Sequence, residues 1–389
     1  MNILEKVLGK PRIFEEQIRD RKISWLELFY DLMFAVLFAK ISDTLVEIGV
    51  EHHHLGLHNL GYAIVVFVWL IWGWNEISGY FDNHGNDSLF NLLAIYTEMV
   101  LSGVAIIFVP EAIEGHFGNL IIWLTLIELL MAVIWLYLAA FDRTHGPASR
   151  VWGVTHLIVF LIMVGGILIG KVTLPILLLA LATNLLTVII ANPWLAREYS
   201  SIQREHQVSD SMIERYGLLT MIAFGEIIAG LYEWINVKNA DSSKLTMFLL
   251  LMVFAALLTA VYYQVLGSLK IVRHSSIGIM MIGYLFLATV LAVVMMGSFI
   301  ILSLKTGAYH FKLGFSISTV AYFAGVITTA IFGIEEREHG RTILRYSLLF
   351  IEAVAFLAIA YLPVVQMIIA ANIIAIIMII QRKFLFVRS

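Results

Sequence analysis

The chain has 389 residues, of which 60% are hydrophobic and only 14% are charged. Its mean hydropathy is +0.90. Soluble proteins are about 45–50% apolar and about 25% charged, so this composition excludes an ordinary soluble protein. The chain has no cysteine, which excludes disulfides and thiolate sites, and its net charge of −3 gives no reason to expect nucleic-acid binding. We therefore expect a protein that crosses a membrane many times.

Twelve apolar segments follow one another along the chain, and each is long enough to cross a bilayer as a helix. At ~1.5 Å per residue, about 20 residues span ~30 Å of hydrocarbon. None alternates in the manner of barrel strands, so the sequence predicts an all-α polytopic membrane protein. Pro363 predicts a tight turn between the last two segments. The segments are 24–49, 56–79, 88–109, 118–140, 150–169, 173–191, 216–236, 245–267, 277–304, 314–333, 343–361 and 363–381.

Basic residues are distributed unequally between the two ends of these segments. If the N-terminus lies in the cytoplasm, 19 of the 25 lysines and arginines fall on the cytoplasmic side and five on the outer side. Lys40 alone lies inside a segment. Because basic loops are retained in the cytoplasm, we expect a multi-pass protein of the cell membrane with both termini inside.

The longest polar connection, residues 192–215, lies halfway along the chain. It predicts a cytoplasmic segment 1–23, a first six-helix half 24–191, a cytoplasmic linker 192–215, a second six-helix half 216–381 and a tail 382–389. Similar short runs begin at Glu27 and Glu214, and both enter the membrane from the cytoplasm. The halves are therefore either a parallel repeat, as in some transporter folds, or a chance match over a few positions.

Two segments resemble the signatures of a known family. Residues 24–32 read Ser-Trp-Leu-Glu-Leu-Phe-Tyr-Asp-Leu, and residues 214–226 begin Glu-Arg-Tyr-Gly-Leu and end Phe-Gly-Glu. Both are similar to signatures of the bacterial low temperature requirement protein A family, whose pattern Tyr80-Phe81-Asp82 also fits loosely. The resemblance implies a polytopic membrane protein linked to growth in the cold, without a settled biochemical activity. The matching positions are Trp25, Glu27, Phe29, Asp31, Glu214, Arg215, Gly217, Gly225 and Glu226, whereas Ser211 and Ile227 depart from the pattern.

Four glutamates lie near the middle of the predicted helices. Glu98, Glu128 and Glu226 stand ten residues into their segments and Glu352 stands nine, which places them ~14–15 Å deep. An ionised side chain there costs at least ~2.5–3.5 kcal/mol. No lysine or arginine lies at a similar depth, so we expect these carboxyl groups to have no ionic partner. They either stay protonated or bind a cation, and both states suit a proton or cation relay.

A structural interpretation of the same polar residues also stands. Protonated glutamates, together with Asn91, Asn184 and Asn372 inside the segments, can link neighbouring helices by hydrogen bonds. Each such bond contributes ~1 kcal/mol or less. In that case the acidic groups would stabilise the bundle without taking part in any transport step.

The first segment carries charges at both of its ends. Glu27 and Asp31 share one helix face near the cytoplasmic end, where they form either a functional gate or a helix start that pairs with nearby basic residues. Lys40 lies near the outer boundary, where its long side chain can reach water. We expect Lys40 to pair either with Asp43 on its own helix or, at the offset between the two similar runs, with Glu226.

These charges favour a proton- or cation-coupled secondary transporter in which Glu226, Glu98, Glu128 and Glu352 carry the coupling ion. The sequence has no phosphate loop or dinucleotide motif, so we expect no cofactor. No metal site is expected either, because the histidines of residues 52–58 are typical of a solvated loop. The expected partners are the lipid bilayer, a proton or small cation, and an unknown small-molecule substrate.

Two other functions stay open at this point. One is a membrane-embedded enzyme that acts on lipid, with Glu27 and Asp31 as its acid–base pair near the headgroups. The other is a non-catalytic scaffold or sensor for growth in the cold. The sequence does not identify the substrate or the oligomeric state.

Overall fold

The computed structural model describes residues 7–16, 21–170, 173–202, 208–235, 241–266, 276–332 and 339–385. Throughout these residues the regular elements are helical: a 3-10 turn, η1 (Phe14–Glu16), precedes thirteen α-helices. The predicted all-α polytopic fold is thereby confirmed. The short helix α5 (Val109–Ile113) connects α4 to α6.

The twelve other helices of the described residues correspond one to one to the twelve apolar segments. Ten of them are long and apolar enough to cross a membrane. The remaining two are α2, which carries six charged residues, and α13, whose apolar part, Phe350–Ile359, is shorter. The bounds are α2 (Trp25–Glu51), α3 (Leu57–His84), α4 (Leu89–Ile107), α6 (Gly118–Phe141), α7 (Gly146–Leu168), α8 (Leu174–Ser201), α9 (Asp210–Trp234), α10 (Ser242–Leu266), α11 (Ser276–Thr306), α12 (Tyr309–Phe332), α13 (His339–Ile359) and α14 (Val364–Leu385).

Helix ends agree with the predicted boundaries except where polar residues extend a helix. The turn predicted at Pro363 is confirmed, because α13 ends at Ile359 and α14 begins at Val364. Helix α3 runs on to His84, past the predicted end at residue 79. Helix α8 includes Pro193 and continues to Ser201, within the predicted linker. Apolar length sets only the membrane-crossing part of a helix, and polar turns prolong it without cost in water.

Parts of two sequence-based predictions lie outside the described residues. The linker 192–215 includes residues 203–207, and the division of the chain at that linker stays a prediction. The orientation also rests partly on such residues, which are Lys6, Arg19, Lys171, Arg204, Lys238, Lys270, Arg273, Arg337 and Arg388.

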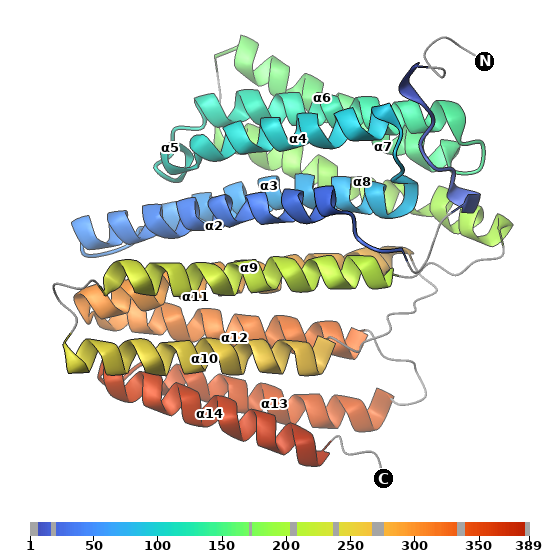
Figure 1. The fold of residues 1–389 in the computed structure, drawn as a ribbon. Helices are drawn as coiled ribbons and strands as arrows, with labels where there is room; N and C mark the ends of the chain where they lie inside the picture. Colours follow the sequence, from blue (N-terminus) through green and yellow to red (C-terminus); the bar gives the residue numbers. More distant parts are fainter. Residues whose placement is uncertain are drawn as a thin grey trace. The chain divides into compact units, whose positions relative to one another are not determined.

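One compact unit comprises Met1–Leu37, His58–Ile213 and Val272–Met281. Within it α6 packs along α4 and α7, and α7 packs along α8, as Figure 1 shows. Sequence neighbours run antiparallel because short connections return the chain directly across the membrane. Close approach of α7 to α6 depends on Gly153: a Cβ at that position would lie 2.6 Å from Leu136 Cγ and 3.1 Å from the Leu136 backbone nitrogen.

The second compact unit comprises Phe38–Leu57, Glu214–Ile271 and Ile282–Ser389. Here α10 packs against α12 and α14, and α13 packs against the same two helices. Helix α9 lies along α11, where the rings of Tyr216 and Phe286 stack with centroids 4.6 Å apart. Gly49 of α2 also lies against Leu302 of α11. Helix α2 thus contributes its first turns to one unit and its last turns to the other.

The contact between α6 and α7 predicts a selective effect of an added methyl group. Gly153→Ala should lower the free energy of unfolding by ~1–3 kcal/mol, because overpacking forces the two helices apart. Gly165→Ala on the same helix should leave stability unchanged or raise it, since nothing lies within 4 Å of its added Cβ. Denaturant titration of both variants in detergent checks this, and equal stabilities would contradict the described packing.

Candidate functional site

In the first unit, helix α3 places Gly73 and Trp74 against acidic groups of neighbouring helices and itself carries Glu76. Gly73 leaves space for Glu98 of α4, because a Cβ there would lie 3.4 Å from Glu98 Oε1. The indole N–H of Trp74 donates to Asp31 Oδ1 of α2 at 2.7 Å. Glu76, one turn further, reaches α6 and α7. Helix α3 therefore connects three buried carboxyl groups of the described part of this unit, those of Asp31, Glu76 and Glu98.

Glu98 is fully buried, at 0% exposure. Its Oε1 accepts a hydrogen bond from Ser102 Oγ at 2.7 Å, and the hydroxyl group of Tyr30 also faces this carboxyl group. Among the described residues no lysine or arginine forms an ion pair with Glu98. Hydroxyl groups can donate to a carboxylate or accept from a protonated carboxyl, so this site accommodates either state.

Glu128 has an ionic partner that we did not expect from the sequence. His156 Nδ1 of α7 lies 2.8 Å from Glu128 Oε2, and Asn184 Nδ2 of α8 donates to Oε1 at 2.6 Å. Both partners are buried. The expectation of an unpaired Glu128 was wrong because it considered only lysine and arginine, whereas histidine is also able to carry a proton.

Glu76 completes this arrangement although it was not a sequence candidate. Trp152 Nε1 of α7 donates to Glu76 Oε1 at 3.2 Å, and Trp135 Nε1 of α6 donates to Oε2 at 3.3 Å. The same Oε2 lies 3.8 Å from His156 Nε2. Glu76 escaped notice because it is three residues from the predicted helix end, and the extension of α3 to His84 places it deeper.

The asparagines of the spans make the cross-helix hydrogen bonds expected of them. Asn91 Oδ1 of α4 accepts from the Tyr80 hydroxyl of α3 at 2.8 Å. Asn372 Nδ2 of α14 donates to the Leu250 carbonyl oxygen of α10 at 3.1 Å. These bonds, like that of Asn184, satisfy polar groups away from water and fix the packing of neighbouring helices.

At the start of α2, Glu27 is held firmly in place. Arg21 binds it through both nitrogens of its fork, Nη1 to Oε1 at 2.8 Å and Nη2 to Oε2 at 2.6 Å. Ser24 Oγ accepts from the Glu27 backbone N–H at 3.2 Å and the Ser24 backbone N–H donates to Glu27 Oε1 at 3.3 Å, which is a capping box. The Ser24 hydroxyl also donates to Oε1 at 2.8 Å. Burial alone would lower the pKa of Arg21, but hydrogen bonding to Glu27 raises that pKa above its usual value.

Arg21 also reaches Asp82 of the loosely matching pattern at the end of α3, and Ser211 at the start of α9 binds the same carboxylate. Arg21 Nε lies 3.5 Å from Asp82 Oδ1, and the same oxygen accepts from Ser211 Oγ at 2.5 Å. Ser211, which departs from the resemblance pattern, thus has a defined hydrogen-bond partner. These contacts hold together the ends of three helices, and both oxygens of the Glu27 carboxylate are already engaged by Arg21 and Ser24.

In the second unit, Glu226 of α9 is half-buried. The charges that act on it are those of Asp43 and Glu233, which are both acidic. Lys40 forms neither of its two expected pairs: within the described residues, no ion pair of Lys40 with Asp43 or Glu226 is present. Its side chain is exposed, although Asp43 stands three residues further along the same helix.

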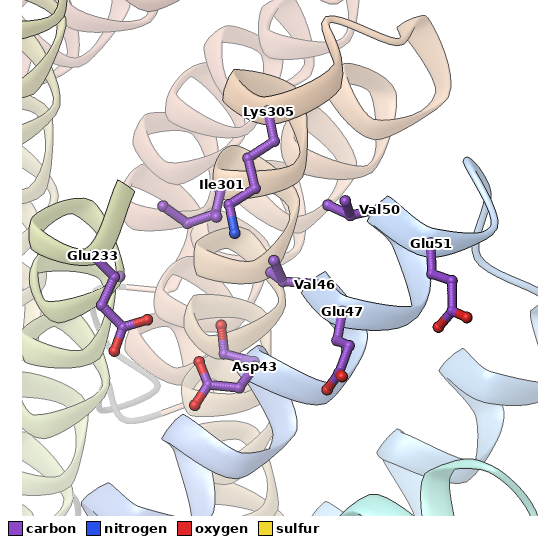
Figure 2. A pocket seen from close by; sticks show the side chains of 10 residues that line it. Asp43, Val46, Glu47, Val50, Glu51, Glu233, Ile301 and Lys305 are labelled. Carbon is purple, nitrogen blue, oxygen red and sulfur yellow. The ribbon is translucent and has the colours of Figure 1, made fainter. Parts of the chain in front are cut away.

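A pocket of about 490 Å³ opens at the ends of α2, α9 and α11 in this unit. Figure 2 shows Glu233 and Asp43 pointing toward one another, with the amine of Lys305 directed into the same space. Glu47 and Glu51 add two more carboxylates on the α2 side. Four acidic groups against one lysine give this acidic pocket a negative potential.

The remaining candidates are dispersed. Glu352 of α13 is half-buried, and the side chain of Gln381 from α14 faces it. Trp25 and Phe29 are exposed, at 88% and 60%, as expected of side chains that meet lipid. Of the second signature, Glu214 and Gly225 are exposed, Arg215 is buried, and Gly217 lies against Tyr263, whose hydroxyl donates to its carbonyl oxygen at 2.9 Å.

Comparison with known protein families shows the family to which this chain belongs. The family described as bacterial low temperature requirement A protein (LtrA) matches residues 22–381. The chain belongs to this family. No curated protein and no solved structure matches it. In this member of the LtrA family, Arg21 binds Glu27 of the first signature and Asp82, and the carboxyl groups of Asp31 and Glu98 lie against α3.

The contact between Arg21 and Glu27 predicts a strong, reciprocal dependence. Arg21→Gln should lower the free energy of unfolding by ~3 kcal/mol, because it leaves a buried carboxylate without its partner. Adding Glu27→Gln should recover part of that loss, whereas Arg150→Gln, an exposed arginine on α7, should change stability by less than ~0.5 kcal/mol. Denaturant titration in detergent measures the coupling, and simple additivity of the two changes would refute the pair.

Proposed function

We propose that this LtrA-family protein is a proton- or cation-coupled secondary transporter of the cell membrane. The observation that carries the proposal is the complete burial of Glu98 and Glu128 near the middle of membrane-crossing helices. Neither carboxyl group pairs with lysine or arginine among the described residues. Ionisable groups at this depth are expensive, and transporters use them to bind and release coupling ions.

The surroundings of Glu98 support such a role. Ser102 and Tyr30 offer hydroxyl groups, and Gly73 keeps the neighbouring helix close without filling the site. A proton can reside on the carboxyl group, or a small cation can take oxygen ligands from all three side chains. Coupling sites of secondary transporters lie near the bilayer midplane between helices, which is the position that we propose for Glu98.

The acidic pocket supports the proposal that cations enter from the outer face of the membrane. The proposed orientation, with both termini in the cytoplasm, places the C-terminal ends of α2, α9 and α11 at the outer face. Carboxylates of Asp43, Glu47, Glu51 and Glu233 would raise the local cation concentration there. Glu226, which the charges of Asp43 and Glu233 reach, would be the next acidic group inward. We also propose that this transport contributes to growth in the cold.

Proton movement in liposomes tests the function. With a pH-sensitive dye inside, wild-type protein should move protons when a pH or sodium gradient is applied with a defined mixture of amino acids, sugars, organic acids and amines. Glu98→Gln should abolish this movement, because the carboxyl group that exchanges the ion is lost. Glu111→Gln, the same change at an exposed position, should leave it intact. Folded wild-type protein that moves no ion under any gradient would overturn the proposal.

The acidic pocket predicts opposite effects of opposite charge changes. Combining Asp43→Asn with Glu233→Gln should raise the cation concentration needed for half-maximal transport, and the effect should shrink at high salt. Lys305→Gln should lower that concentration, because it removes the pocket's positive charge. Initial rates at several ionic strengths measure both changes. Equal concentration dependence in all variants would exclude the pocket from the entry route.

A further inference from the structure

Glu76, His156 and Glu128 form a cluster, the Glu–His–Glu cluster, whose charges do not balance. Helices α3, α6 and α7 bring the three groups together about 12–15 Å from the nearer helix ends. With His156 protonated between two carboxylates, the net charge is −1. The groups that face His156 are Glu128 from α6 and Glu76 from α3, and Asn184 of α8 adds only a neutral amide.

A buried net charge of this kind is costly in a membrane. Moving a charge out of water without full compensation costs roughly several kcal/mol in a protein. No lysine or arginine of the described residues pairs with any of the three groups. One additional monovalent cation makes the cluster neutral. The cluster can therefore bind one monovalent cation, the kind of ion that a cation-coupled protein exchanges. The hydrogen-bond donors around the cluster indicate which cation it binds.

The donors around the cluster favour a proton over a metal ion. Each of the four carboxylate oxygens already accepts an N–H group, from Trp152, Trp135, Asn184 or His156. A hard metal cation needs several oxygen ligands directed at one point. The described residues contain no group of three histidine or acidic side chains placed to hold a metal ion. A proton needs only one free lone pair on a single oxygen.

The two carboxylates differ in how firmly their negative charge is held. Glu128 accepts short bonds of 2.6 Å from Asn184 and 2.8 Å from His156. Glu76 accepts longer bonds of 3.2 and 3.3 Å from neutral indoles, and its Oε2 lies 3.8 Å from His156, beyond hydrogen-bond distance. Shorter and charge-assisted bonds stabilise an ionised carboxylate more. Glu128 and His156 therefore form the lasting ion pair, and Glu76 is the group that changes its charge.

The cluster also keeps polar atoms without partners. His156 Nε2 and Asn184 Oδ1 are buried and form no hydrogen bond in the described structure. A purely structural network would satisfy every buried polar atom, because each unsatisfied one costs free energy. They belong to the two residues that bind Glu128, so a proton that moves within the cluster has further polar atoms beside it.

We propose that Glu76 is a proton-binding residue that takes up and releases one proton in each cycle. The proton comes from water and forms an O–H bond on a Glu76 carboxylate oxygen, so the cluster charge changes from −1 to zero. Release breaks that bond and returns the proton to water. The coupling of this exchange to solute movement rests on the proposed transport function, whereas the proton binding itself does not.

Infrared difference spectroscopy of the purified protein at different pH values tests the proton-binding step. Wild-type protein should show a carbonyl band of a protonated carboxyl group that disappears as the pH rises. Glu76→Gln should lose this band, and Glu111→Gln should keep it. Glu76→Asp should keep a carboxyl band at a changed frequency, which provides the assignment if the glutamine variant does not fold. A band unchanged in both Glu76 variants would overturn the proposal.

Proton flux in liposomes separates the two claims. If the wild-type protein moves protons and Glu76→Gln abolishes that movement together with the band, both claims are supported. If the band is lost but proton movement is unchanged, Glu76 does not carry the coupling proton, and the transport function stands without it. If the band behaves as expected and the wild-type protein moves no ion, the transport function is overturned while proton binding by Glu76 is upheld.

Discussion

The structure depends on one constraint, which is that a carboxyl group inside a membrane finds no water to solvate it. Each such group must obtain its hydrogen bonds from the protein or give up its charge. In the first unit indole, imidazole, amide and hydroxyl groups take the place of water. Just before the start of α2, Arg21 supplies the positive charge that binds Glu27.

Helix α3 has the central place in this arrangement. Its tryptophans provide large apolar surfaces for packing, and the indole N–H groups of Trp69 and Trp74 donate to the Leu177 carbonyl oxygen and to Asp31. Gly73 permits the approach of Glu98 from α4. A helix that both packs and donates in this way can hold several acids at defined depths without adding positive charge. This explains how the first unit buries ionisable carboxyl groups.

The sequence predicted the helices well because apolar length is a direct physical requirement of crossing a bilayer. All twelve segments have a counterpart in the described residues, and the burial of Glu98 and Glu128 followed from their depth along the helix. The partners could not be predicted in the same way. His156 and Glu128 meet through the packing of α6 against α7, which helix periodicity does not specify, and Glu76 was hidden by a helix end placed five residues too early. The predicted ion pairs of Lys40 are not found among the described residues for a related reason, because side-chain direction depends on neighbours that the sequence does not reveal.

Charge displacement during a pH jump is the most direct test of the claim that buried acids of this protein exchange protons. Membranes that contain the purified wild-type protein can be adsorbed on a solid support, and the current can be recorded when the pH of the solution is changed rapidly. Protons that move from water to mid-membrane carboxyl groups should give a transient current whose charge increases with the amount of protein. Wild-type protein that gives no more current than protein-free membranes, over the whole accessible pH range, would contradict the account.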